Sequence, residues 1–456
     1  MREGSVMRAL LLCSLGAVLL WFAWHSFSGS TANAADDVVS PGVMLPPEKP
    51  TDAPSVPSAV PPPDSQSGGQ PAVRVAAAQR PESAKVAVSP PAAADVEPRP
   101  VPISVLPDKA EIDLARTLVS NPEGFVEIVE KRSDLPSARR NFALALGKAL
   151  TGKHDEARGL SNGIAEETLV RASEKAFLDR LLGGRVTIAQ AASATTESAL
   201  VWAALLVSES REGERLANEG KSADAARTFS SVLLDYVRAP WPADRAVLQR
   251  WSDSLEKNQR RHRWNRTGEW PSVEVKVVAG DSLIGLRKRV LLQHPELQFC
   301  TGQIVRANEK RSDMLREGET LRVPIDRVRM LVDLDAHWAF YLVANEVAAA
   351  YEIGVGKDGA TRVGRYVVGN DKRKDPMWFK PGGPPVPFGS PENPLGTRWI
   401  AWLTEDGNET SLGFHGTNDP RSIGKDESQG CIRMLDDDIE ELFEILPVGA
   451  VIDVQA

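Results

Sequence analysis

The sequence is poor in cysteine and histidine, which limits the chemistry that it can support. Three cysteines among 456 residues are too few for the disulfide framework of a small secreted domain. The six histidines are scattered and form neither a His-x-x-x-His nor a His-Glu-x-x-His pair, so no zinc site is expected. Gly356-Lys357 is followed by Asp358 where a P-loop requires Ser or Thr, which argues against a nucleotide site. We therefore expect neither a metal nor an organic cofactor.

Positive charge is also scarce. The formal net charge is −8 and no basic tail or arginine-rich run occurs, so nucleic acid is not an expected partner. The apolar fraction of 42% and the charged fraction of 25% are ordinary for globular domains. The length allows roughly three domains, with linkers between them.

A mostly apolar run at residues 9–24 follows a short start that contains arginine. It is shorter than the roughly 20 residues of a membrane span, and Ala32-Asn33-Ala34 offers a small-residue cleavage site. Leu12 is too large for lipoprotein processing at Cys13, and the apolar run continues beyond it. We predict residues 1–34 as an export segment, with cleavage favoured over a retained anchor, and hence a location in the cell envelope, periplasmic or extracytoplasmic.

Proline is concentrated in residues 41–107, which hold 17 of the 33 prolines and show no apolar periodicity. Such a composition predicts a disordered tether over residues 35–107. In polyproline geometry, at about 3.1 Å per residue, it spans roughly 200 Å. We interpret it as a spacer.

Residues 108–265 have apolar residues at helical spacing. Two similar segments lie 68 residues apart, twice the roughly 34-residue period of tetratricopeptide repeats, and in each a glycine-led turn opens a helix. They are Gly152-Lys153-His154-Asp155-Glu156-Ala157 and Gly220-Lys221-Ser222-Ala223-Asp224-Ala225. A copy near Gly183-Gly184 is out of phase, so we predict helical hairpins and leave open whether they stack as a repeat. A structural spacer and a protein-binding platform both remain open.

Residues 273–324 open with alternating valines and Gly280-Asp281-Ser282, and close with Leu321-Arg322-Val323-Pro324. By themselves the first residues predict only a turn that caps a helix. Together the two ends resemble a LysM domain. This resemblance implies a small α+β unit of βααβ order that binds the N-acetylglucosamine backbone of peptidoglycan or chitin, with glycan contacts at Gly280, Asp281, Ser282 and Asn308.

Residues 327–456 contain short β-branched and aromatic runs separated by Asn, Gly and Asp, which predict strands. One amphipathic helix follows Asp436–Asp438, whose charges complement the helix dipole. A last strand is expected at residues 450–454. The fold class predicted for this region is mainly β.

The chemistry is concentrated between His415-Gly416-Thr417 and Ser428-Gln429-Gly430-Cys431-Ile432-Arg433-Met434. A free thiol has a pKa of about 8.5 and needs a base, for which imidazole is the usual choice. Backbone groups around Gly430 and Cys431 can hold an oxyanion. Arg433 suits bidentate contact with a substrate carboxylate, and Ser428 offers a further hydrogen bond.

This frame resembles the YkuD-type L,D-transpeptidases, which crosslink bacterial peptidoglycan. Ile353-Gly354-Val355-Gly356-Lys357 and Pro394-Leu395-Gly396 extend the similarity over nearly the whole region. The resemblance implies that Cys431 is the nucleophile and His415 the general base and acid. It places the other substrate or oxyanion contacts at Arg433, Ser428, Gly430, Gly416 and Thr417.

The sequence departs from that family at two places. Gln429 stands where a second histidine is usual, and Thr361-Arg362-Val363-Gly364 replaces Thr-Pro-x-Gly. Glutamine cannot carry a proton at neutral pH, so a non-catalytic peptidoglycan-binding scaffold remains an alternative to an active transpeptidase. Transfer to water would make an L,D-carboxypeptidase, and transfer to a protein lysine would anchor a protein to the wall.

The expected partners are peptidoglycan stem peptides and glycan strands, and a protein bound through the helical region. Membrane contact is expected only through the N-terminal segment. Cys300 is interpreted as a small buried hydrophobe. A bridge from it to Cys431 is not expected, because the two lie in separate predicted domains and a disulfide would block the nucleophile.

Overall fold

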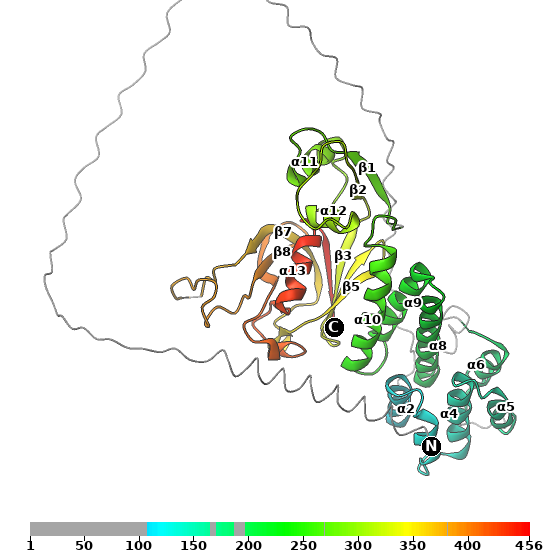
Figure 1. Ribbon diagram of the computed structural model, residues 1–456. Helices are drawn as coiled ribbons and strands as arrows, with labels where there is room; N and C mark the ends of the chain where they lie inside the picture. The colour runs from blue at the N-terminus through cyan, green and yellow to red at the C-terminus, as the bar shows by residue number, and fades with distance from the viewer. Residues whose placement is uncertain (1–106, 165–169, 187–196, 269, 381) are drawn as a thin grey trace, which may run out of the picture. The chain divides into compact units, whose positions relative to one another are not determined.

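The computed structural model describes residues 107–164, 170–186, 197–268, 270–380 and 382–456 (Figure 1). The predicted export segment and all of the proline-rich tether except Pro107 lie outside these ranges. The described residues belong to one compact unit. No helix in these ranges has the length and apolar character needed to span a bilayer.

The N-terminal described region is helical, as predicted. Its helices are α2 (Lys109–Ser120), α3 (Phe125–Glu130), α4 (Ser137–Leu150), α5 (His154–Asn162), α6 (Ala172–Gly183), α8 (Ala199–Asn218), α9 (Ser222–Tyr236) and α10 (Arg245–His262).

The two glycine-led turns have the same geometry. Gly152 joins α4 to α5 with φ 77°, and Gly220 joins α8 to α9 with φ 78°, values that favour glycine. In each turn the following lysine amide donates back to the end of the first helix, Lys153 to Lys148 O at 2.8 Å and Lys221 to Leu216 O at 2.9 Å. This is the Schellman arrangement. The predicted helical hairpins are thus confirmed, and a repeat stack stays a prediction.

The helical region covers one face of the C-terminal sheet. Its buried core is continuous with Leu331, Trp338 and Phe340 of that sheet, and α9 and α10 contact strand β5 (Glu346–Glu352) (Figure 1). The peptide of Val347 is held from both sides, since its N–H donates to Ser230 Oγ at 2.7 Å and its carbonyl accepts from Gln259 Nε2 at 2.8 Å. The helices are therefore part of the sheet's packing.

Residues 272–324 form the predicted order of strand, helix, helix and strand: β1 (Ser272–Lys276), α11 (Leu283–Gln293), α12 (Thr301–Ala307) and β2 (Thr320–Pro324). The two strands pair antiparallel, and Ser282 caps α11 by accepting from Gly285 N at 3.1 Å. The assignment of this unit to the LysM family stays a prediction.

The C-terminal region is built on a sheet that, in the described residues, has the strand order β11-β9-β8-β7-β12-β3-β4-β5. Besides β5, the strands are β3 (Val328–Asp333), β4 (Trp338–Val343), β7 (Gly364–Lys374), β8 (Arg398–Thr404), β9 (Glu409–His415), β11 (Ile432–Arg433) and β12 (Val451–Gln455). A short pair, β6 (Val355–Gly356) and β10 (Asp426–Ser428), lies beside it. The short helices η2 (Lys357–Gly359) and η3 (Pro420–Ser422) lie in connections. The predicted mainly-β class is confirmed.

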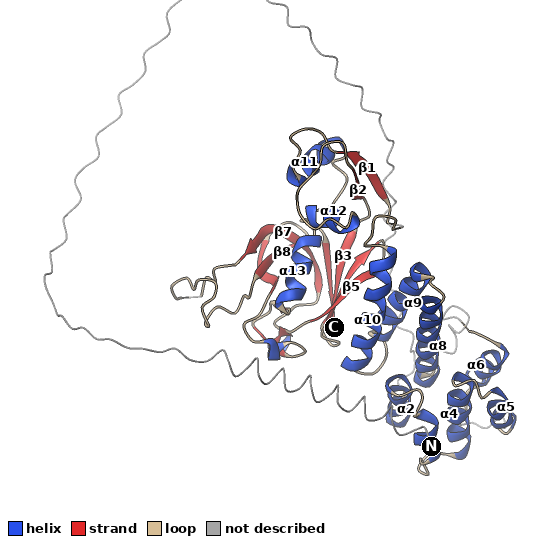
Figure 2. Cartoon of the chain, in the orientation of Figure 1, coloured by secondary structure: helices blue, strands red, loops and turns tan. Residues whose placement is uncertain are grey.

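Helix α13 (Asp436–Ile445) packs against the sheet (Figure 2). Its Ile439, Leu442 and Ile445 are fully buried, so the helix is amphipathic as predicted. The same helix contacts α12 of the βααβ unit. There Gly302 lies so close to the backbone of Glu444 that an added Cβ would come within 2.0 Å of its carbonyl oxygen. The βααβ unit is therefore packed on the sheet domain through α12.

Candidate active site

The structure places Cys431 and His415 on neighbouring segments of the sheet. Cys431 directly precedes β11, which runs parallel to β9 with Ile432 opposite Phe414 and Arg433 opposite His415. The Cys431 thiol lies against the β9 backbone, with Sγ 3.3 Å from the Ser411 carbonyl oxygen. These contacts come from residues 20 apart in the chain, so the juxtaposition is a product of sheet pairing.

His415 is buried and held in one orientation. Its Nδ1 lies 2.6 Å from the Gly416 carbonyl oxygen, and because a carbonyl only accepts, Nδ1 carries the proton and Nε2 is left as an acceptor. Trp399 stacks on the ring at 6.0 Å between centroids. Burial, assisted by the charge of Arg433, lowers the pKa of His415 to about 4. The imidazole is thus neutral at neutral pH and able to take a proton.

Burial has the opposite effect on the cysteine. It raises the pKa of the Cys431 thiol to about 11, although the Gly413 backbone and Arg433 oppose the shift. The resting pair is therefore a neutral thiol and a neutral imidazole. Neither group therefore carries a charge before a substrate binds.

The loop before the nucleophile is fixed by two hydroxyl groups. Ser428 Oγ donates to Cys431 O at 2.6 Å and accepts from Gly430 N at 3.0 Å. Thr361 Oγ1 donates to Gly430 O at 2.8 Å and accepts from Gly356 N at 2.8 Å. Gly430 itself has φ 128°, a conformation that requires glycine.

These contacts show what Ser428 and Gly430 do within the protein. Ser428 is 2% exposed and its hydroxyl is engaged within the loop, so it positions the loop. The Gly430 amide is also engaged by Ser428, which leaves the Cys431 amide as the backbone donor for an oxyanion. The role of Thr361 was not foreseen, since its Thr-x-x-Gly context indicated only a turn.

The His-Gly-Thr segment is held by a carboxylate from the start of α13. Asp436 Oδ1 accepts from Thr417 N and from Thr397 N, both at 3.3 Å. A Cβ on Gly416 would come within 2.2 Å of the same oxygen, so only glycine fits there. Thr417 is buried, and its hydroxyl donates to Asp419 O at 3.2 Å. Gly416 and Thr417 therefore act as positioning residues, and Asp436, which the sequence indicated only as a helix-dipole residue, is their partner.

The substrate contact expected of Arg433 stays a prediction. Its backbone pairs with Gly354 through two hydrogen bonds of 2.9 Å, while its Nε is buried and has no hydrogen-bond partner among the described residues. A guanidinium with an unpaired donor beside a thiol suits a substrate carboxylate. Gln429, the position of the main departure, is exposed.

The residues expected to contact glycan separate into two groups. Gly280 and Ser282 are exposed at the turn before α11, and Asp281 accepts from Val278 N at 3.0 Å. Asn308, by contrast, is 4% exposed. Its Nδ2 donates to Ile304 O and Arg322 O, and its Oδ1 accepts from Arg322 N at 2.9 Å. Its amide thus holds α12 to β2, which gives Asn308 a structural role in this unit.

The remaining cysteine lies outside this site. Cys300 is half-buried and its Sγ donates to the Glu444 carbonyl oxygen at 2.9 Å. Burial raises the pKa of its thiol. Cys300 and Cys431 are both free thiols.

Comparison with known proteins shows a family match for the C-terminal region. Residues 327–454 match the model of the YkuD family, described as an L,D-transpeptidase catalytic domain. This match supports the predicted resemblance of these residues to a YkuD-type L,D-transpeptidase catalytic domain.

Among relatives, two proteins of Bacillus subtilis carry the name L,D-transpeptidase. YqjB is 38% identical over 109 residues, which cover 24% of this chain and 60% of YqjB. YkuD is 29% identical over 161 residues, which cover 34% of this chain and 85% of YkuD. This chain thus spans less than two thirds of YqjB. A solved L,D-transpeptidase from Enterococcus faecium is 24% identical, with a TM-score of 0.24, over 32% of this chain and 56% of that one.

Proposed function

We propose that this protein is an exported peptidoglycan L,D-transpeptidase that forms crosslinks through a thioester on Cys431. The observation that carries the proposal is the position of Cys431 beside the strand that ends in a neutral His415, whose Nε2 is left as acceptor, within residues that match the L,D-transpeptidase model. Backbone and hydroxyl contacts hold the nucleophile loop in place before any substrate arrives.

In the first half-reaction, Cys431 Sγ attacks the carbonyl carbon of the third stem residue, which we expect to be diaminopimelate, as His415 Nε2 takes the thiol proton. The C–N bond to the terminal D-alanine then breaks, and the imidazolium gives its proton to the departing amine. The Cys431 amide stabilises the oxyanion. Arg433 pairs with a carboxylate of the stem peptide. A thioester remains on the enzyme.

In the second half-reaction an amine of a neighbouring stem attacks the thioester. His415 takes a proton from that amine, the C–S bond breaks, and the sulfur recovers its proton through the imidazole. The new bond is an amide between two stems. The N-terminal segment would export the chain, and the βααβ unit, as a LysM domain, would hold it on glycan.

The exposed Gln429 keeps a second candidate open, a wall-binding scaffold without chemistry. The test incubates the full chain with disaccharide-tetrapeptide and follows D-alanine release and the mass of dimers. Wild type is expected to release D-alanine and form dimers, whereas Cys431→Ala should do neither. Gln429→His is the matched comparison, and activity gained only in that variant would favour the scaffold.

D-alanine release without dimers would instead indicate a carboxypeptidase or an enzyme that uses a protein acceptor. The full chain is needed, because the helical region covers Trp338 and Phe340 on one face of the sheet. Removing that region would expose an apolar surface and promote aggregation.

A further inference from the structure

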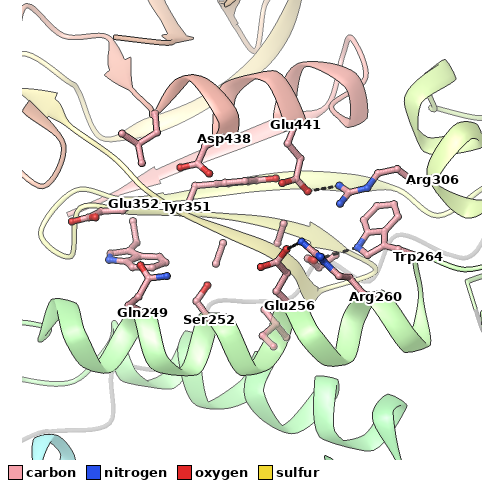
Figure 3. Close-up of a pocket in the computed structure, with 16 residues that line it drawn as sticks. Gln249, Ser252, Glu256, Arg260, Trp264, Arg306, Tyr351, Glu352, Asp438 and Glu441 are labelled. Carbon is pink, nitrogen blue, oxygen red and sulfur yellow. Dashed lines mark hydrogen bonds and ion pairs between the residues drawn. The ribbon is translucent and has the colours of Figure 1, made fainter. Parts of the chain in front are cut away.

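A cavity of about 230 Å³ lies between α10, β5 and α13 (Figure 3). Asp438 and Glu441 extend into it from α13, Ser252 and Glu256 face it from α10, and Tyr351 lies on β5 between the two helices. None of the residues to which the previous sections assign a part in the reaction lines it. The cavity is therefore a separate feature of the fold.

Tyr351 brings an unsatisfied hydroxyl group to this cavity. The residue is 3% exposed, and its phenolic oxygen has no hydrogen-bond partner among the described residues. Leaving a buried hydroxyl unpaired costs about 1–3 kcal/mol, and such groups usually find a partner. A ligand in the cavity would supply one.

Asp438 brings an unpaired carboxylate to the same space. It is half-buried and, in the described part of the chain, no hydrogen bond or ion pair compensates it. The other carboxylates of the cavity wall each have an arginine partner: Glu441 pairs with Arg306, Glu256 with Arg260, and Glu352 with Arg245.

The surroundings of Asp438 disfavour the charged form of its carboxyl group. Burial raises the pKa of Asp438 to about 7, and the neighbouring charges of Glu441, Asp437, Glu256 and Glu352 add to the shift. Arg306 and Arg260 also line the cavity, but their charges are used by Glu441 and Glu256. A bound cation would therefore stabilise the Asp438 carboxylate.

One part of the wall is apolar and includes Leu255, Trp338 and the stretch 348–350. It suits an alkyl chain better than a hydrated ion. A bare calcium ion would need six to eight oxygen ligands, whereas the paired carboxylates leave few. An ammonium group has three donors and no acceptor, which matches one carboxylate and one phenolic oxygen.

We propose that this cavity binds a primary ammonium group carried on a short aliphatic chain, with the Asp438 carboxylate and the Tyr351 hydroxyl as its polar partners. The alkyl chain would lie against Leu255 and Trp338. The inference does not depend on the reaction at Cys431, since the cavity and its lining are described without reference to that reaction.

The test titrates the full chain with n-pentylamine in a calorimeter at pH 8, with 1-pentanol as the neutral comparison. Asp438→Asn should weaken amine binding at least about tenfold, because hydrogen bonds to charged groups contribute about 1.5–3 kcal/mol. Tyr351→Phe should weaken it severalfold. Asp437→Asn, which alters an exposed carboxylate on the same helix, should leave the affinity unchanged. Amine binding should also weaken below pH 7, as Asp438 gains a proton.

Thermal unfolding of each variant separates lost binding from lost folding. The proposal is overturned if pentylamine does not bind, if pentanol binds equally well, or if folded Asp438→Asn binds the amine like wild type. A second titration with a stem tripeptide that ends in diaminopimelate identifies the source of the amine. An affinity that depends on Asp438 and not on Asp437 would assign a peptide-borne amine, and binding of pentylamine alone would assign a free one.

Discussion

Thr361→Val tests the argument that a hydroxyl far from Cys431 in the sequence holds its loop. The two side chains have nearly the same shape, but valine removes the bonds to Gly356 N and Gly430 O, both 2.8 Å long. Thr361 is 3% exposed, so water cannot replace them freely. Each buried group left unpaired costs about 1–3 kcal/mol. We therefore expect a loss of about 2–4 kcal/mol in the free energy of unfolding.

Urea unfolding followed by tryptophan fluorescence measures this loss, with the slope compared between variants. Thr361→Ser keeps the hydroxyl and is the control, expected to stay within about 1 kcal/mol of wild type. The rate of D-alanine release should fall at least about tenfold in the valine variant, since Gly430 adjoins the nucleophile. If valine and serine variants unfold at the same urea concentration and react equally fast, the positioning role of Thr361 is refuted.

Three further predictions concern single residues. The pKa of His415 is about 4 in the folded protein against 6.5 in the unfolded chain. Between these pH values the unfolded chain binds more protons, so the free energy of unfolding should fall as pH drops from 6.5 to 4. His415→Asn should flatten that part of a curve of stability against pH. Gly356→Ala would place a Cβ 2.6 and 2.8 Å from backbone atoms and should cost about 1–3 kcal/mol in urea unfolding, whereas Gly159→Ala, with open space around it, should be neutral or stabilising. Gly302→Ala should weaken the contact between α12 and Glu444. Backbone amides of the βααβ unit should then exchange hydrogen faster. Unchanged exchange would contradict the packing described.

The sequence predicted those features that depend only on residues close together in the chain. The Gly152 and Gly220 turns were predictable because a positive φ and the Schellman hydrogen bonds involve residues within one turn. The strands between residues 328 and 455 follow from β-branched and aromatic runs. Cys431 and His415 could be proposed as catalytic residues because few residue types can perform acyl transfer.

Residues whose partners lie far along the chain could not be interpreted in this way. Asn308 has the same amide whether it faces glycan or closes α12 onto β2, and its burial decides between them. Asp436 was consistent with a helix-dipole residue until its contacts with Thr397 and Thr417, 39 and 19 residues away, were known.

The residue types of the site, its two departures from the family and the division into helical, βααβ and β regions were thus present in the chain's own order of residues. The tertiary structure alone decided the protonation preferences of Cys431 and His415, since burial is a property of the packed fold. It also decided that Gln259 reaches Val347 across 88 residues, and that Tyr351 and Asp438 share one cavity. Such pairings depend on which surfaces meet, and long-range packing is not encoded in any short window of sequence.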